Sequence, residues 1–189
     1  ALMSMIGNDL LNEIVIGQGI RSPEKILKEL HFKVKKVLRK EEEKHYGGMD
    51  MSLCLIDKEN GYVSFAGARN SLIVIQDDQL EELKGSRISI GSTWVKKGQK
   101  HFTNQDVLLT EAPKTFYFFS DGYQDQFKYD TRIKFSKKRL KSLLHNIHKE
   151  PMEKQKMILQ RKIEQWMYDN EGVFCEPQTD DILVVGFKA

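Results

Sequence analysis

The stretch Thr115-Phe116-Tyr117-Phe118-Phe119-Ser120-Asp121-Gly122 joins a short aromatic run to a carboxylate and a glycine. The run is apolar and short, which predicts a buried strand over residues 115–119. A carboxylate at the end of a buried strand is held rigidly, so Asp121 is a candidate ligand for a hard divalent cation, and Gly122 allows a close approach of backbone or substrate. A strand followed by Asp-Gly is also a common turn, and this stretch alone leaves that alternative open.

A second acidic step, Gln178-Thr179-Asp180-Asp181-Ile182, comes directly before the apolar run 182–187. That run predicts a buried central strand. Side chains alternate along an extended chain, so Asp180 and Asp181 should point to opposite sides. If this strand lies beside the one that ends at Asp121, acids from distant positions meet. Their repulsion would be roughly 1 to 4 kcal/mol, and a divalent cation would offset it.

The rest of the chain shows helical and strand-like spacing of apolar residues. The spacing predicts helices over residues 2–16, 23–38, 136–148 and 151–169, and strands over residues 51–56, 62–66, 71–75, 79–83 and 106–109. Asn60-Gly61 between the first two strands is a strong hairpin signal, because both residues tolerate positive φ. The strands are expected to form an antiparallel meander that packs in layers with the helices, an α+β fold in a single domain.

Composition excludes several classes of protein. The chain has 189 residues, 40% of them hydrophobic and 30% charged, which is too apolar for a disordered chain and too polar for a membrane protein. The net charge of +3 is small. A nucleic-acid-binding protein is expected to carry a far stronger positive charge, concentrated in a basic stripe. No apolar stretch is long enough to span a membrane, so no direct membrane insertion is expected. Two cysteines without metal-ligand spacing favour a reducing, cytoplasmic location.

Five short motifs occur in order along the chain. They are Met3-Ser4-Met5-Ile6-Gly7-Asn8, Gly48-Met49-Asp50-Met51, Phe65-Ala66-Gly67-Ala68-Arg69-Asn70, Phe119-Ser120-Asp121-Gly122-Tyr123 with Asp125-Gln126-Phe127, and Gln178-Thr179-Asp180-Asp181-Ile182. Together they resemble the SpoIIE/RsbU-like branch of the metal-dependent (PPM-type) serine/threonine protein phosphatases. The resemblance implies an α-β-β-α sandwich of antiparallel sheets flanked by helices, with Mn²⁺ or Mg²⁺ bound at one edge of the sheets.

The resemblance also implies roles for individual residues. Asp121 and Asp180 match the family's metal-binding aspartates, and Gly122 and Asp181 match positions that support the metal site. No side chain is expected to act as a nucleophile. In the family, a metal-bound water whose pKa is lowered by the cation attacks phosphoserine or phosphothreonine.

Three further residues have alternative interpretations. Asp50 is expected at the start of a strand that follows Gly47-Gly48, so it is either the cap of a turn or a residue near the metal edge that communicates with the first helix. Arg69 and Asn70 are expected on a hairpin turn, where asparagine suits left-handed geometry, and they are candidates for contacting the substrate phosphate. The five histidines are scattered and are expected at the surface.

The chain departs from the family pattern at its beginning. The family has an upstream acidic strand and an Asp-x-x-Gly-His-Gly-like loop whose aspartate bridges two metals, and neither occurs here. We therefore expect a phosphatase domain over residues 1–189 that is truncated at its N-terminus, lacks its N-terminal strands, binds one metal at most and turns over poorly. The sheet edge left unpaired predicts self-association, with a homodimer as one form.

The resemblance implies a role in bacterial signalling. The expected partner is a phosphorylated protein, typically of the anti-anti-sigma type, and the parent chain is expected to carry an upstream sensor domain. The alternative is a phosphatase-like binding or scaffold module without turnover, which could use the basic face of the helix over residues 23–38. The acidic run 41–43 largely offsets that basic face. No nucleic acid is expected as a partner.

Overall fold

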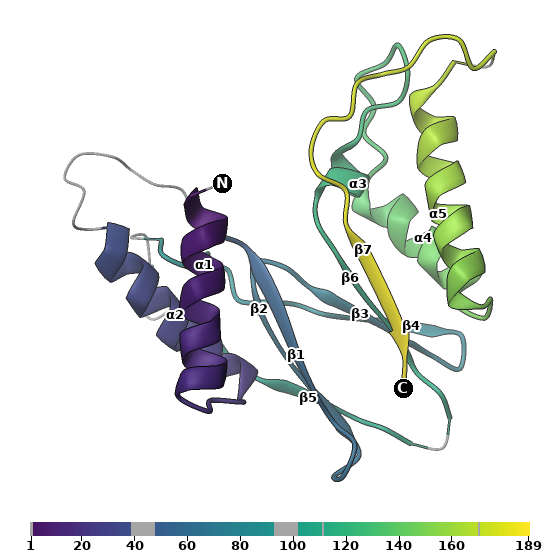
Figure 1. The fold of residues 1–189 in the computed structure, drawn as a ribbon. Coiled ribbons are helices and arrows are strands. Elements are labelled where there is room, and N and C mark those ends of the chain that lie inside the picture. Colours follow the sequence, from purple (N-terminus) through teal and green to yellow (C-terminus); the bar gives the residue numbers. More distant parts are fainter. Residues whose placement is uncertain (1, 39–47, 93–101, 111, 170) are drawn as a thin grey trace. The chain divides into compact units, whose positions relative to one another are not determined.

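The computed structural model describes residues 2–38, 48–92, 102–110, 112–169 and 171–189. The acidic run 41–43 lies outside them. By their contacts the residues form two compact units, the first Ala1–Leu72 with Glu82–Glu111 and the second Ile73–Glu81 with Ala112–Ala189. Each unit has its own sheet and its own helices, as Figure 1 shows. The expectation of a single domain stays a prediction.

The first unit combines helices with a three-stranded antiparallel sheet. Its elements are α1 (Leu2–Asn12), the π-helix η1 (Glu13–Gly17), α2 (Pro23–Leu38), β1 (Met51–Asp57), β2 (Tyr62–Ala68) and β5 (Gln105–Leu108). The strand order is β1-β2-β5. The predicted hairpin at Asn60-Gly61 is confirmed by the register of β1 and β2, which places Asp57 opposite Tyr62. Only Gly61 of the turn has positive φ, at 66°.

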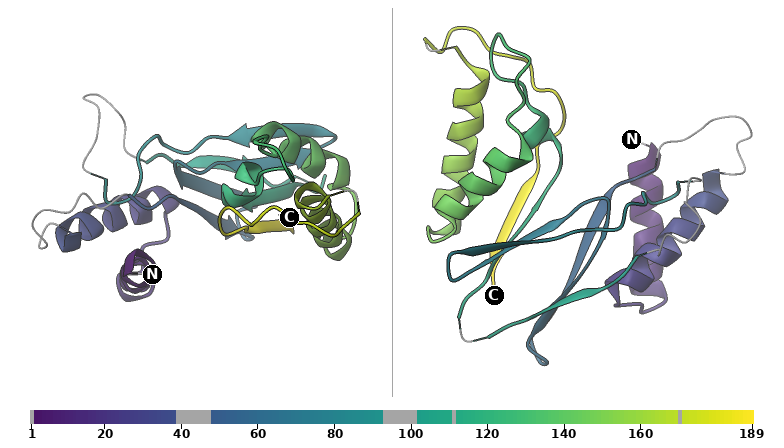
Figure 2. Two further views of the ribbon diagram at one scale, coloured as in Figure 1. Left: turned by 90° about the horizontal axis from the view of Figure 1, so that it is seen from above. Right: turned by 180° about the vertical axis from the view of Figure 1, so that it is seen from behind.

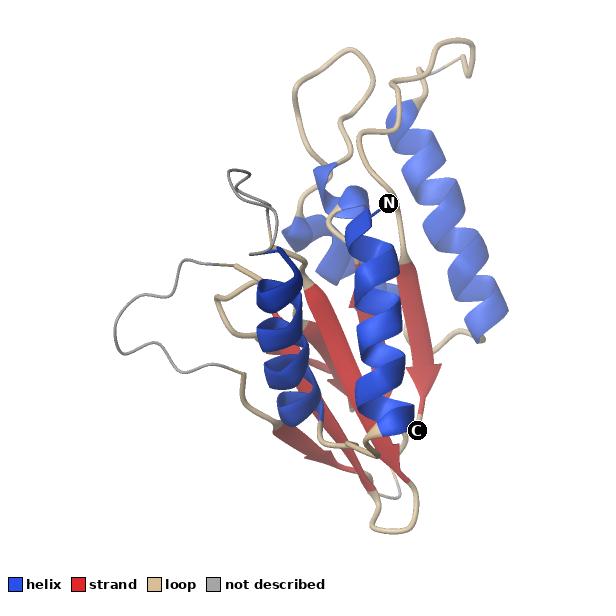
Figure 3. Cartoon of the chain, turned by 60° about the vertical axis from the view of Figure 1, so that its left-hand side comes forward, coloured by secondary structure: helices blue, strands red, loops and turns tan. Residues whose placement is uncertain are grey.

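The core of the first unit lies between its helices and its sheet. Leu27, Leu30 and Val34 of α2 are fully buried against Ala66 and Ala68 of β2. These α2 positions follow the 3-4 spacing of one helix face, which is why an amphipathic sequence docks there. Figure 3 shows α1 and α2 side by side over this sheet.

The second unit is built on a four-stranded antiparallel sheet. Its elements are β3 (Leu72–Gln76), β4 (Gln79–Leu83), β6 (Thr115–Phe119), α3 (Gly122–Asp125), α4 (Lys137–Ile147), α5 (Met152–Met167) and β7 (Val184–Lys188). The strand order is β4-β3-β6-β7, so β7 is an edge strand next to β6. Figure 2 shows β7 running beside β6 when the molecule is seen from behind.

The core of the second unit joins strand residues to helix residues. Ile73, Ile75 and Tyr117 from the sheet pack with Leu140 and Leu144 of α4. Tyr117 Oη donates to Gln155 Oε1 of α5 at 2.7 Å, so the buried hydroxyl is satisfied. Burial raises the pKa of Tyr117 to about 12.

Three expectations about the fold need correction. The apolar run 182–187 does not form a buried central strand, because β7 lies at the edge of its sheet and none of its residues is buried. The strands do not form one meander, because the chain leaves the first sheet after β2 and begins a second sheet with β3. The helix expected over residues 2–16 changes at Glu13 into a π-helix, in which Gln18 N donates to Glu13 O at 2.9 Å. The antiparallel sheets with flanking helices agree with the expected fold class. No helix within the described ranges is long and apolar enough to cross a membrane.

Candidate metal centre

The end of β6 and the beginning of β7 bring Asp121 and the pair Asp180-Asp181 to the same end of the sheet. This region is named here the acidic edge. Because the strands are antiparallel, Phe119 pairs with Val184, and the residues after one strand lie beside those before the other. Ser120 N donates to Leu183 O at 2.9 Å, and Leu183 N donates to Ser120 Oγ at 3.0 Å. The pairing that would bring Asp121 near the Asp180 step is therefore present.

Gly122 is required by the close packing of these two segments. A Cβ added at Gly122 would lie 2.4 Å from the backbone oxygen of Asp181 and 3.1 Å from that of Asp180. No side chain fits at such a distance, so only glycine lets the chain after Asp121 pass the acidic step. Close packing thus explains why glycine stands at position 122, while its link to a metal stays a prediction.

The three carboxylates of this edge differ in their partners. Asp180 Oδ1 accepts a hydrogen bond from Asp181 N at 2.7 Å. The other oxygen of that carboxylate has no hydrogen-bond partner among the described residues. Asp121 precedes α3, and its backbone oxygen accepts from Asp125 N at 2.9 Å, but its side chain makes no capping bond. Among the described residues, the carboxylates of Asp121 and Asp181 have no hydrogen-bond or ion-pair partner, so both can accept a ligand.

Gln126 holds the acidic step in place, and the sequence patterns did not identify this role. Its side chain is fully buried. Gln126 Oε1 accepts from Thr179 N at 2.9 Å, and Gln126 Nε2 donates to Pro177 O at 2.9 Å. One amide thus satisfies two backbone groups just before Asp180. Only the position of Gln126 five residues after Asp121 signals it in the sequence, and glutamine at that spacing has many structural uses.

The donor chemistry of this edge suits a hard cation. Carboxylate and backbone oxygens are the ligands that Mg²⁺ and Mn²⁺ prefer. Within the part of the chain that the structure describes, no group of three or more His, Cys, Asp or Glu side chains is placed to hold a metal ion. The metal-binding roles of Asp121, Asp180 and Asp181 therefore stay predictions.

Asp50 lies in the first unit and has a structural partner. Ser89 Oγ, on a buried residue, donates to Asp50 Oδ1 at 2.6 Å. The neighbouring Met49 exchanges backbone hydrogen bonds with Ile90 at 2.9 and 2.8 Å. Met49 also lies against Gly7 of α1, where an added Cβ would be 3.0 Å from the Met49 methyl carbon. Asp50 is thus one residue from a contact with the first helix, and its link to a metal stays a prediction.

Arg69 and Asn70 do not lie on a hairpin turn, which corrects the sequence-based expectation. They follow β2 where the chain leaves the first sheet. The left-handed residue is Arg69, with φ of 59°, rather than Asn70. Arg69 N donates to Ser86 O at 2.7 Å, and this bond offsets the cost of the unusual conformation. The Arg69 side chain is exposed, and phosphate binding by these two residues stays a prediction.

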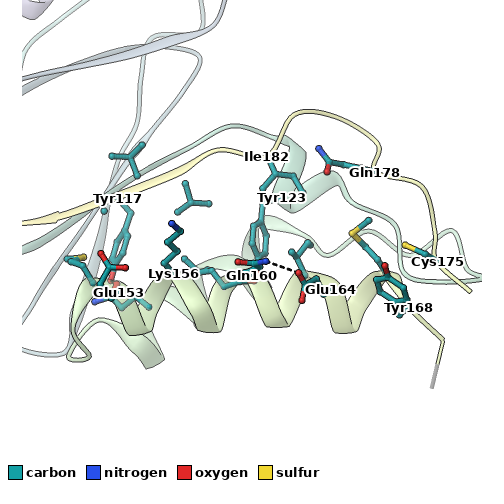
Figure 4. Close-up of a pocket in the computed structure, with 18 residues that line it drawn as sticks. Tyr117, Tyr123, Glu153, Lys156, Gln160, Glu164, Tyr168, Cys175, Gln178 and Ile182 are labelled. Carbon is teal, nitrogen blue, oxygen red and sulfur yellow. Dashed lines mark hydrogen bonds between the residues drawn. The ribbon is translucent and has the colours of Figure 1, made fainter. Parts of the chain in front are cut away.

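A pocket of about 680 Å³ lies between α5 and the β6–β7 face of the second unit (Figure 4). Tyr117, Tyr123 and Ile182 line it together with residues of α5. Among the described residues that line it, none is Asp121, Asp180 or Asp181. The pocket and the acidic edge are therefore separate features of the same unit.

The expectation of surface histidines is wrong for two of the five. His31 is 1% exposed and its Nδ1 accepts from Gly91 N at 3.2 Å, and His148 is 8% exposed. His148 Nε2 lies 3.5 Å from Asp78 Oδ1. The first contact attaches the middle of α2 to Gly91, and the second attaches the C-terminal end of α4 to the β3–β4 turn. His45 and His101 lie outside the described residues.

Comparison with known proteins gives one consistent result. A family model described as Stage II sporulation protein E (SpoIIE) matches residues 1–189. No curated protein sequence matches the chain. Among solved structures, the SiaA-PP2C domain of Pseudomonas aeruginosa is 26% identical, with a TM-score of 0.82, and the match covers 100% of this chain and 70% of that chain.

Two more distant structures share the fold. The phosphatase domain of the cell fate determinant SpoIIE from Bacillus subtilis, presoaked with Mn, is 14% identical with a TM-score of 0.55, covering 96% of this chain and 72% of that one. PppA, a regulatory component of T6SS in Pseudomonas aeruginosa, is 13% identical with a TM-score of 0.51, covering 85% and 66%. At these identities the likeness concerns the fold alone.

Proposed function

The chain belongs to the SpoIIE family of PP2C-type phosphatase domains, and on this premise we propose that it hydrolyses phosphoserine or phosphothreonine in a regulatory protein. One observation carries the proposal. The strand pairing of β6 with β7 brings Asp121 and the Asp180-Asp181 step to one edge, with two carboxylates that have no partner among the described residues.

In this proposal Asp121 and Asp180 hold a divalent cation, Mn²⁺ or Mg²⁺, with Asp181 in a supporting position. A bound cation would neutralise charge on the phosphoryl oxygens and lower the pKa of a water molecule. The protein's own contribution is rigidity. Ser120, Gly122 and Gln126 fix the two backbone segments, so that the carboxylates keep their places when the substrate arrives.

Among the described residues no group of three or more His, Cys, Asp or Glu side chains could hold a metal ion. We therefore propose that the chain by itself holds one cation and turns over slowly. The same observation favours a second candidate, a phosphatase-like module that binds a phosphoprotein without hydrolysing it. For both candidates the partner is a phosphorylated signalling protein of the anti-anti-sigma type.

The position of β7 at the edge of its sheet supports a proposal about self-association. In the strand order β4-β3-β6-β7, one side of β7 carries no paired strand within the described sheet. Exposed strand edges pair with other chains. We propose that a homodimer forms through β7, which static light scattering over a range of concentrations would detect as a rising mass.

The test of the enzymatic proposal is release of phosphate from a phosphoserine protein, with and without Mn²⁺. Asp121→Asn should abolish Mn²⁺-dependent release. Asp77→Asn is the matched control, because Asp77 is an exposed acid in the β3–β4 turn of the same unit, and its positive φ of 49° suits asparagine. Phosphoprotein binding without any phosphate release would favour the binding module instead.

A further inference from the structure

The charges of the second unit are separated along the chain. Residues 128–141, named here the basic segment, contain seven basic residues and one acidic residue. The basic residues are Lys128, Arg132, Lys134, Lys137, Lys138, Arg139 and Lys141. Outside this segment the second unit carries 7 basic and 13 acidic residues. The whole unit is therefore neutral by formal charge, and its positive charge is concentrated in one place.

The fold of the basic segment gathers these charges. Its first part is a small hairpin in which Phe127 pairs with Lys134 and Lys128 N donates to Ile133 O at 2.9 Å. Its second part is the start of α4, where Ser136 Oγ accepts from Arg139 N at 3.4 Å. Residues that are distant within the segment are thus brought to one place next to α3.

Aromatic rings hold several of the cations without neutralising them. Arg139 Cζ lies 5.1 Å and Lys128 Nζ 5.7 Å from the centre of the Trp166 ring. Lys134 Nζ lies 5.8 Å from the centre of the Phe127 ring. Cation–π contacts of this kind orient a charged group but leave its charge intact. The side chains of Lys128, Lys134 and Arg139 are classed as exposed, so their charge reaches solvent.

Arg139 is fixed further by backbone bonds. Its Nη1 donates to Lys134 O at 3.2 Å and to Phe135 O at 3.1 Å. Lys134 is also held by a carboxylate, since its Nζ lies 3.2 Å from Asp125 Oδ2. By contrast, neither hydrogen bond nor ion pair holds Arg132 or Lys138 within the described structure. Their charges are available to a partner.

Hydrogen bonds connect the residues just before the basic segment, Asp125 and Gln126, to the acidic edge. Asp125, which pairs with Lys134, donates its N–H to Asp121 O, one turn of α3 away. Gln126, which opens the hairpin, binds Pro177 O and Thr179 N just before Asp180. A phosphorylated residue at the edge would therefore have its neighbours over the basic segment.

We propose that the basic segment binds acidic side chains that flank the phosphorylated residue of the protein substrate. This inference rests on the proposed function, because it concerns the partner of the same edge. An acidic protein fits better than a nucleic acid. The positive charge is confined to the basic segment, and the rest of the unit carries 7 basic and 13 acidic residues. That surplus of acids would repel a continuous phosphate backbone, while a protein can place isolated acids.

Binding can be measured without turnover. In a Trp94→Phe background Trp166 is the single tryptophan of the chain, and the cations on its ring make its fluorescence a reporter of binding. The probes are a phosphoserine peptide flanked by glutamates and the same peptide with glutamines. We expect tighter binding of the glutamate peptide, with an affinity that falls as salt rises.

Two double variants separate the basic segment from general charge. Arg132→Gln with Lys138→Gln removes two exposed charges that have no structural partner, and should weaken the glutamate peptide about three- to tenfold. Arg161→Gln with Lys162→Gln removes two exposed charges of α5 and should change its affinity less than about twofold. Equal effects of the two double variants, or equal affinity for both peptides, would overturn the inference.

The outcomes also separate this inference from the proposed function. Preference for the glutamate peptide without any phosphate release would support the basic segment while rejecting hydrolysis. Phosphate release with no preference between the peptides would support hydrolysis and reject the acidic partner. Single-stranded DNA that changes the Trp166 fluorescence at lower concentrations than the glutamate peptide does would overturn the inference in favour of a nucleic acid.

Discussion

The side chain of Gln126 accepts a hydrogen bond from the backbone N–H of Thr179, 2.9 Å away. The same amide donates to Pro177 O, so a residue next to α3 fixes the segment that carries Asp180 into β7. The positions of the two acidic steps thus depend on one buried polar side chain as well as on the pairing of β6 with β7.

Replacement of Gln126 tests this relationship. Gln126→Leu would leave two backbone groups without partners and should lower the free energy of unfolding by about 2 to 3 kcal/mol. Urea unfolding measures the loss, and hydrogen exchange at Thr179 should become faster. Gln124→Leu is the matched control, because Gln124 Oε1 is buried without a hydrogen-bond partner among the described residues. A loss as large in Gln124→Leu would contradict the role of Gln126.

Gly122 provides a second test of the geometry. The Cβ of Gly122→Ala would lie 2.4 Å from Asp181 O, so the two segments must separate, at a cost of about 1 to 3 kcal/mol. Thermal unfolding measures this cost. At Gly17 an added Cβ would meet only the Glu13 side chain at 4.0 Å, so Gly17→Ala should be nearly neutral. Equal stability of Gly122→Ala and the wild-type protein would show that the edge is looser than described.

The β3–β4 turn predicts a dependence on pH. The hydrogen bond from Lys149 Nζ to Asp78 Oδ2, at 2.6 Å, lowers the pKa of Asp78. A carboxyl whose pKa is lower in the folded state stabilises that state above its ordinary pKa of about 3.9, and this contribution is lost as the pH falls through the folded-state value. The difference in Tm between the wild-type protein and Asp78→Asn should therefore be present at neutral pH and vanish in acid.

The neighbouring residue is the control for this effect. Asp77 is exposed in the same turn and has no ion-pair partner within the described structure, so Asp77→Asn should leave Tm nearly unchanged at neutral pH. A Tm difference for Asp78→Asn that stays constant from pH 7 to below the range of carboxyl titration would contradict the account.

Much of the fold follows from local sequence patterns. The runs around Phe116 and Val184 are short and apolar and do form paired strands, and the helix predicted over residues 136–148 is present as α4, with Ser136 as its N-cap. The division into two sheets does not follow from these patterns, because strand periodicity states which face is buried and not which strand is the neighbour. The π-helix at Glu13 keeps helical spacing of apolar residues, so periodicity did not separate it from α1.

The candidate site was partly predictable for a similar reason. Asp121 follows an apolar strand and Asp180 precedes one. A carboxylate at the end of a buried strand is a recognisable candidate for a metal ligand in a sequence. Gln126 has no such signal, because its role comes from contacts with residues 51 and 53 positions away. Arg69 has positive φ although asparagine follows it, because the backbone bond to Ser86 O, and not residue preference, fixes the conformation.

The central claim is that Asp121 and Asp180 hold the cation on which phosphate release depends. Its most direct test is the Mn²⁺ dependence of phosphate release from a phosphoserine protein, compared between the wild-type chain and Asp121→Asn. The account predicts that Asp121→Asn either abolishes release or raises the Mn²⁺ concentration for half-maximal release by at least roughly tenfold. An unchanged Mn²⁺ dependence in Asp121→Asn would contradict the claim.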